Sequence, residues 1–123
     1  MKSESTVRAA LLELYPGLAR INFNVVEEHR EAEDGSRNTV YVYNMVEIRR
    51  KLPVIVPFTQ DDYPMLVSSL VRERYSEDDV EAILNNYLAD PEGHKADFDE
   101  LQAWRVKAKE VAREVIESNK HNS

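Results

Sequence analysis

The chain has no cysteine and only three glycines among its 123 residues. Without cysteine it can form no disulfide, offer no thiolate to a metal and use no cysteine nucleophile. Gly17, Gly35 and Gly93 lie in three separate turn dipeptides, so no GxGxxG, GxxxxGK[ST] or GxSxG motif can be built from them. Phosphate-cradling glycine loops and the serine elbow of hydrolases are therefore excluded.

Long apolar runs are also missing. No stretch approaches the ~18 consecutive apolar residues of a membrane helix, and the charged start of the chain argues against a signal peptide. A length of 123 residues is typical of a single domain with its own core. The sequence thus predicts one domain over residues 1–123, located in the cytoplasm and without a membrane partner.

The net charge of −7 is spread unevenly along the chain. Residues 1–58 are neutral, residues 59–100 hold 3 basic and 12 acidic residues, and residues 101–123 hold 5 basic and 3 acidic residues. An acidic surface repels phosphate backbones, which disfavours a nucleic-acid partner. The basic end is expected to lie against the acidic helices that precede it.

Apolar residues near the start recur at helical spacing, and they are Val7, Ala10, Leu11, Leu14, Tyr15 and Leu18. This spacing predicts a helix from about Ser5 to Tyr15, ended by Pro16-Gly17.

Beyond that point the apolar period changes to two, which predicts a long antiparallel β-hairpin. Asp34-Gly35 is a hairpin turn signal, and the second strand, TVYVYNMVEI, is rich in β-branched and aromatic residues. A two-residue turn there would place Ile21 opposite Ile48 and Phe23 opposite Val46. The segment Val54–Val56, bracketed by two prolines, predicts a short third edge strand or an extended crossing.

The second strand of this hairpin is apolar on both faces. One face carries Val40, Val42, Val46 and Ile48, and the other carries Tyr41, Tyr43 and Met45. Such a strand is expected to be covered on both sides. The cover is either the chain's own helices or, on the tyrosine face, a second copy or a ligand.

Three helices are predicted from residue 59 onward. Ser76 begins the second of them as an N-cap, with Asp79 completing a capping box. Asp97 is expected to cap the third, which should run to about Ser118 before a frayed tail.

The acidic segment 88–101 invites a metal-binding reading, which its spacing does not support. With Gly93 at the sixth position of an EF-hand loop, Leu88 would be the first ligand, and leucine cannot bind calcium. The three histidines have no zinc spacing. The segment is interpreted as a joint between two helices, and no metal site or cofactor is predicted.

Two charged groups admit a structural and a functional interpretation. Glu27, His29 and Glu31 can share one strand face, as a solvated hairpin arm or as a group in which His29 acts as a base or a ligand. Arg105, Lys109 and Arg113 follow each other at intervals of four residues. They form either a solvated helix face or a strip for an acidic partner or nucleic acid.

The run ERYSEDDVEAILNNYLAD, followed by FDELQAWRVKAKEVA, resembles the C-terminal part of short uncharacterised proteins of bacterial prophages and mobile elements. The resemblance spans residues 73 to about 112. It implies a mobile-element origin and a structural or accessory role, and it transfers no functional residue.

The sequence therefore predicts an α+β fold with an N-terminal helix, a long antiparallel hairpin, a short third strand and three C-terminal helices. The favoured function is a non-enzymatic protein interaction or assembly module, and no catalytic residue is assigned. Its partner is another protein or, as the favoured case, further copies of the chain, bound through the sheet or the helical face. The residues expected to mediate the interaction are Tyr41, Tyr43, Met45, Trp104, Arg105, Lys109 and Arg113. The alternatives are a small enzyme or ligand binder with a pocket near Tyr41, Tyr43 and Trp104, or a nucleic-acid accessory protein that uses Arg49–Lys51 and the helical strip.

Overall fold

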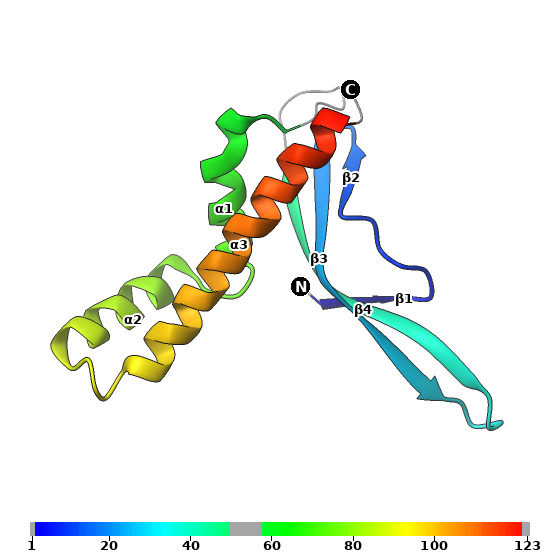
Figure 1. Ribbon diagram of the computed structural model, residues 1–123, viewed down its shortest axis with the longest axis horizontal. Helices are drawn as coiled ribbons and strands as arrows, with labels where there is room; N and C mark the ends of the chain where they lie inside the picture. Colours follow the sequence, from blue (N-terminus) through cyan, green and yellow to red (C-terminus); the bar gives the residue numbers. More distant parts are fainter. Residues whose placement is uncertain (1, 50–57, 122–123) are drawn as a thin grey trace. The chain divides into compact units, whose positions relative to one another are not determined.

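A computed structural model describes residues 2–49 and 58–121. The chain divides into two units, one up to residue 57 and one from residue 58. The first contains a four-stranded antiparallel sheet and the second contains three α-helices (Figure 1). The α+β content agrees with the prediction, whereas the strand predicted at Val54–Val56 lies outside the described residues.

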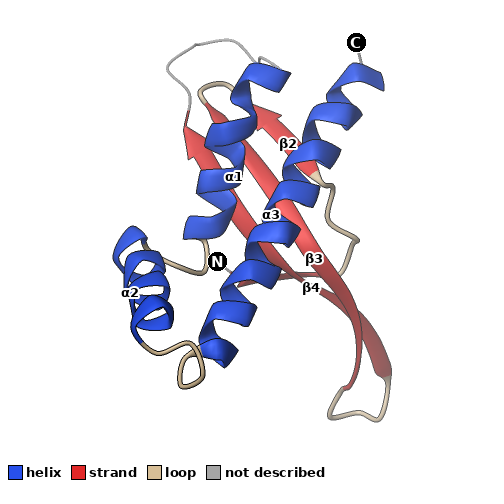
Figure 2. Ribbon diagram, turned by 60° about the vertical axis from the view of Figure 1, so that its left-hand side comes forward, coloured by secondary structure: helices blue, strands red, loops and turns tan. Residues whose placement is uncertain are grey.

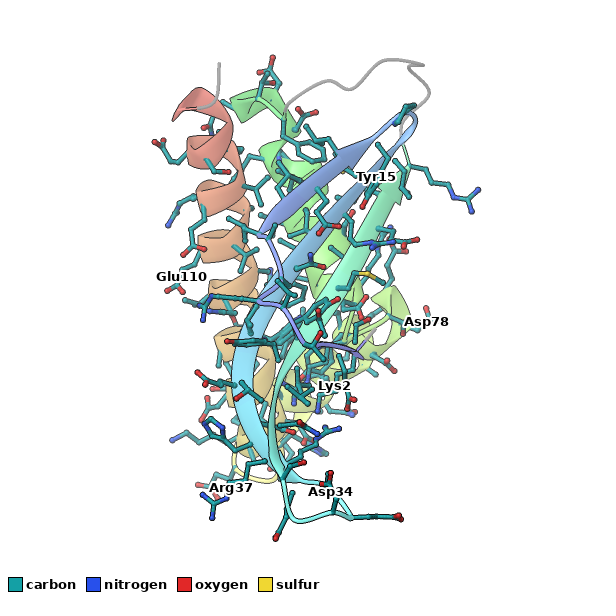
Figure 3. All side chains as sticks on the ribbon, turned by 90° about the vertical axis from the view of Figure 1, so that its right-hand side faces the viewer. Lys2, Tyr15, Asp34, Arg37, Asp78 and Glu110 are labelled. Carbon is teal, nitrogen blue, oxygen red and sulfur yellow. The ribbon has the colours of Figure 1, made fainter. Side chains whose placement is uncertain are left out.

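The sheet is built around one long hairpin. Its strands are β1 (Lys2–Ser5), β2 (Leu12–Tyr15), β3 (Leu18–Glu31) and β4 (Arg37–Arg49), in the order β1-β4-β3-β2. The short strands β1 and β2 pair with the outer edges of β4 and β3 over four residues each. Beyond them, β3 and β4 continue as a two-stranded ribbon (Figure 2). Asp34 and Arg37 lie at its tip, at the opposite end of the hairpin from Tyr15 (Figure 3).

The predicted N-terminal helix is wrong, because this part of the chain forms β1 and β2. Pro16-Gly17 is a hairpin turn: Tyr15 pairs with Leu18, and Gly17 has φ 77°. Proline followed by a glycine at positive φ is the signature of a type II turn. An isolated helix of about eleven residues is marginal, so pairing with β3 outweighs the helical spacing.

The predicted β3–β4 hairpin is confirmed, but the predicted register is wrong. The turn has three residues rather than two: the Gly35 N–H donates to the Ala32 carbonyl (2.9 Å), and the Ala32 N–H donates to the Ser36 carbonyl (2.7 Å). Gly35 has φ 83°, as expected where a left-handed residue completes such a turn.

A β-bulge then shifts the register once more. Phe23 faces Asn44 and Val26 faces Val42, so Asn24 and Val25 together oppose a single residue of β4. Asn24 has φ 53°, a left-handed conformation that asparagine tolerates better than most residues. As a result Ile21 faces Val46, not Ile48, and Phe23 faces Asn44, not Val46.

The part of the hairpin that is farthest from its turn is buried on both faces, as the two-sided apolar pattern of β4 predicts. The buried apolar side chains of the sheet are Ala19, Ile21, Phe23, Met45, Val46 and Ile48. Asn22 is also buried, and its Nδ2 donates to the Ala10 carbonyl (2.8 Å). The part nearer the turn is less buried, because Tyr41 and Tyr43 are only half-buried and Val26 is 55% exposed.

The helical unit has its apolar core between α1 and α3. It contains a 3-10 turn (Gln60–Asp62), α1 (Tyr63–Arg72), α2 (Glu77–Ala89) and α3 (Lys95–His121). α1 lies alongside the C-terminal half of α3, and α2 alongside its N-terminal half (Figures 1 and 2). The buried apolar side chains of the unit are Phe58, Leu66, Leu70, Leu101, Ala108, Val111, Ala112, Val115 and Ile116.

The predicted start of α2 is confirmed in detail. The Asp79 N–H donates to the Ser76 hydroxyl (3.0 Å), and the Ser76 N–H donates to the Asp79 carboxylate (3.2 Å), which completes the capping box. None of the helices in the described ranges is long and apolar enough to cross a membrane.

Within the segment 88–101, residues 90–94 are the joint between α2 and α3, in which an Asp90 carboxylate oxygen accepts a hydrogen bond from the Gly93 N–H (3.2 Å). α3 begins at Lys95, so Asp97 lies inside its first turn and the predicted Asp97 cap is wrong. The acid is still placed favourably, because the helix dipole stabilises negative charge there. α3 also continues to His121, beyond the predicted end near Ser118.

Candidate functional site

A groove of about 420 Å³ opens in the helical unit, between α1, α2 and α3. Its apolar lining consists of Val67, Val71, Tyr75, Val80 and Leu84. Its polar lining consists of Ser68, Arg72, Glu77, Glu81 and Arg105. We refer to this site as the helical groove.

The groove exists because α2 covers its apolar stripe only partly. α1 directs Leu66 and Leu70 into the core, whereas the next residue after each of them, Val67 and Val71, stays half-buried at the groove. No residue of α2 is buried, and Val80 and Leu84 are half-buried. Two apolar helix faces therefore meet without closing on each other.

The charges of the groove are not equivalent. Arg72 is hydrogen-bonded and ion-paired to Glu77, which neutralises both side chains. Arg105 is half-buried and has no hydrogen bond or ion pair with any side chain in the described part of the chain. Glu81 is exposed, and within the same ranges it also lacks an ion-pair partner. Among the described residues, the groove thus has two unpaired charges of opposite sign, the half-buried Arg105 and the exposed Glu81.

The three residues of the predicted helical strip have different surroundings. Arg105 lines the groove, Lys109 is exposed, and the Arg113 guanidinium lies 6.0 Å from the centroid of the Tyr63 ring. A cation over an aromatic face is a modest stabilising contact. Of the three residues, only Arg105 lines the helical groove.

Trp104 is a packing residue next to the groove. Its indole N–H donates to the Leu70 carbonyl (3.2 Å), and the Arg74 guanidinium lies 5.4 Å from the centroid of its ring. The same guanidinium lies 5.3 Å from the Tyr75 ring. These contacts fix the connection between α1 and α2 against α3.

The predicted residues of the sheet divide into core and surface. Met45 is only 8% exposed and belongs to the core of the described fold, whereas Tyr41 and Tyr43 are half-buried on β4, where it pairs with β1. Tyr41 lies opposite Glu27 on β3 and opposite Ser5 on β1. Every residue that lines the helical groove belongs to the helical unit, whereas both tyrosines belong to the sheet unit.

The ribbon surface is held by a charged cluster. Arg30 donates to both carboxylate oxygens of Glu4 (2.8 and 3.1 Å) and to Glu28 (3.1 Å). The Arg30 hydrogen bonds and charge lower the pKa of the Glu4 carboxyl. His29 lies 3.5 Å from Glu27 and 3.3 Å from the Thr39 hydroxyl. The five charged side chains of this cluster are substantially exposed, as expected for the solvated hairpin arm.

Within the described ranges, no group of three histidine or acidic side chains is placed to bind a metal ion. The sequence interpretation missed the helical groove. The available signal was the width of the apolar stripes: α1 carries Val67 and Val71 beside its core leucines, and α2 carries Val80 and Leu84. An apolar stripe this wide is broader than the face that a helix buries against one neighbouring helix, so part of it is left to line a groove.

The chain matches no protein-family model, no curated protein and no solved structure.

Proposed function

We propose that the protein is a non-enzymatic assembly module that forms a homodimer through the outer edge of β3. The observation that carries this proposal is the ribbon. β2 pairs with β3 only from Leu18 to Ile21, so in the described ranges no strand pairs with the outer edge of β3, the edge away from β4, from Asn24 to Glu31. Unpaired backbone N–H and C=O groups along a strand edge are a template for another strand.

A second copy of the chain suits this edge because an antiparallel edge can pair with its own twofold mate. Pairing centred on His29 places Glu28 of each copy opposite Arg30 of the other. These two contacts join opposite charges on neighbouring strands. The paired segment, residues 27–31, would be about 17 Å long at ~3.3 Å per residue.

The dimer would also stabilise the ribbon itself. A two-stranded ribbon is marginal in water, whereas three or more strands with an apolar face are stable. Joining two ribbons gives four strands, and the exposed Val26 and the half-buried Val40 and Val42 of both copies would lie on the same face of the joined sheet.

The edge also limits which strands can join it. The same register places Glu27 opposite Glu31 of the other copy, which is unfavourable, although Arg37 lies opposite Glu31 within each hairpin. Charges on an edge prevent unselective pairing. The proposed dimer is therefore selective and should weaken at high salt.

The test is the solution mass, measured by light scattering on a size-exclusion column over a hundredfold range of concentration. We expect the unmodified protein to be a dimer at the upper concentrations. Glu28→Arg places like charges opposite each other and should give a monomer. The double variant Glu28→Arg/Arg30→Glu restores opposite charges across the twofold axis and should recover the dimer.

Glu33→Arg is the matched control, because it makes the same charge change in the turn, outside the paired segment. It should remain dimeric. A protein that is monomeric at every concentration would refute the proposal, as would a Glu28→Arg variant that dimerises like the control.

Other predictions from the sequence stay proposals with less support. A prophage or mobile-element origin rests on the resemblance of residues 73–112, and the cytoplasmic location rests on composition. The nucleic-acid alternative has less support, because its helical strip is not uniform: Arg113 lies over the Tyr63 ring, whereas Arg105 lines the helical groove. Arg50 and Lys51 of the basic run lie outside the described residues.

A further inference from the structure

We propose that the helical groove binds a small carboxylate with an aliphatic chain. The chain would lie against Val67, Val71, Val80 and Leu84, and the carboxylate would be bound by Arg105. This site goes beyond the proposed assembly and does not depend on it, since all of its residues belong to the helical unit.

The size and lining of the groove fit a small molecule. Small-molecule pockets typically range from about 300 to 1,000 Å³ and are mostly apolar with a few polar groups that set the orientation. The groove, at about 420 Å³, lies at the lower end of this range. Its apolar walls come from two different helices, so an aliphatic chain between them would be in contact on both sides.

The charge of the head group follows from the burial of the two unbalanced side chains. Arg105 is half-buried, so it has lost part of its hydration without gaining a protein partner. Glu81 is exposed and keeps its hydration. An anion bound at Arg105 therefore gains more binding free energy than a cation bound at Glu81 would gain.

The geometry favours a monoanion over a phosphate. A guanidinium can bind one carboxylate through two parallel hydrogen bonds. A dianion would need a second free cation, and the other arginine of the groove, Arg72, is already paired with Glu77. One carboxylate is thus the head group that the groove can satisfy.

Isothermal titration calorimetry with octanoate, octanol and octylamine tests which head group the groove prefers. Trp104 is the single tryptophan of the chain, and its fluorescence gives an independent signal next to the groove. We expect octanoate to bind at least about tenfold more tightly than either of the other two, which is the size of a charge-assisted contact. Each methylene added from hexanoate to octanoate should tighten binding about fourfold.

Arg105→Gln should weaken the binding of octanoate by about tenfold or more, so that octanoate binds with the same affinity as octanol. Lys109→Gln, one turn later on the exposed face of α3, removes the same charge and should leave binding unchanged. Circular dichroism melting confirms that both variants are folded. Equal binding of the three probes would show only unselective apolar contact and would overturn the proposal. Equal effects of the two substitutions would overturn it as well.

Discussion

The Asn22 side chain donates a hydrogen bond to the Ala10 carbonyl across 2.8 Å, from a position that is 2% exposed. The neighbouring Leu11 carbonyl accepts from the Asn22 backbone N–H (2.9 Å). Together these bonds attach the segment that connects β1 to β2 onto the middle of β3. The Asn22 Oδ1 has no hydrogen-bond partner in the described ranges. The sheet thus depends on a buried amide that is only half satisfied.

Replacing this amide with a carboxylate should be strongly destabilising at neutral pH. Asn22→Asp removes the donor and buries a charge beside the Ala10 carbonyl, which should reduce the free energy of unfolding by about 3 kcal/mol. Burial raises the pKa of the introduced carboxyl in the folded state. Stability is then present at low pH and is lost as pH rises through that pKa, so the deficit should shrink from pH 7 to pH 5.

Urea unfolding at the two pH values measures this effect, with Asn85→Asp as the control, because Asn85 is exposed on α2. The control should change stability little at either pH. Equal losses for the two substitutions would show that the Asn22–Ala10 contact does not hold the connecting segment.

The bulge at Asn24 makes a separate prediction about backbone conformation. A β-branched residue at φ 53° is strained, so Asn24→Val should reduce the free energy of unfolding by about 1–2 kcal/mol. Asn24→Gly should be tolerated, since glycine adopts positive φ readily. The control is Asn38→Val, at an exposed and regularly paired position of β4. If Asn24→Val and Asn38→Val unfold at the same urea concentration, the bulge is not a fixed feature of the hairpin.

The contact between Glu4 and Arg30 predicts a pH effect on β1. Arg30 lowers the pKa of Glu4, so the contact stabilises the fold above the unfolded-state pKa of Glu4 and is lost as pH falls through the lower folded-state value. Arg30→Gln should raise the pKa of Glu4 toward its ordinary value. Carboxyl chemical shifts in an NMR titration measure this directly.

Asp34 is the internal control of the same titration. Its pKa is lowered by hydrogen bonds from the Ser36 hydroxyl and backbone N–H within the turn, which Arg30 does not contact. The Asp34 value should stay low in Arg30→Gln. If the pKa of Glu4 stays equally low in the variant, then the ion pair with Arg30 is not what lowers it.

The local signals of the sequence predicted those parts of the fold that short-range chemistry determines. The Ser76 capping box, the hairpin and the three helices all depend on residues close together in the chain. The N-terminal helix failed because Leu12 and Leu14 fit a strand as well as a helix. Only the presence of β3 beside them, with Leu12 opposite Ile21, decides between the two.

The register and the groove were beyond such signals for different reasons. The register depends on a one-residue difference in turn length and on the bulge at Asn24, and neither leaves a periodic pattern. The groove depends on how completely α2 covers α1, which is a property of tertiary packing. Arg105 was predicted as an interaction residue, but its separation from Lys109 and Arg113 needed the structure.

The joint between α2 and α3 contains an aromatic contact whose energy can be isolated. The rings of Tyr87 and Phe98 are stacked, with centroids 3.9 Å apart and planes inclined by 10°. Tyr87 lies near the end of α2 and Phe98 in the first turns of α3, so the stack closes the joint at residues 90–94. Since no residue of α2 is buried, this contact should supply a notable share of what holds the helix.

A double-mutant cycle of Tyr87→Leu and Phe98→Leu tests this contact, because leucine keeps apolar bulk and helix propensity while removing the ring. We expect a coupling free energy of about 0.5–1.5 kcal/mol in urea unfolding. A second cycle that pairs Leu88→Ala with Phe98→Leu should give a coupling near zero, since Leu88 is adjacent to Tyr87 but 77% exposed. Equal couplings in the two cycles would mean that the joint is held by general apolar burial rather than by the stacked pair.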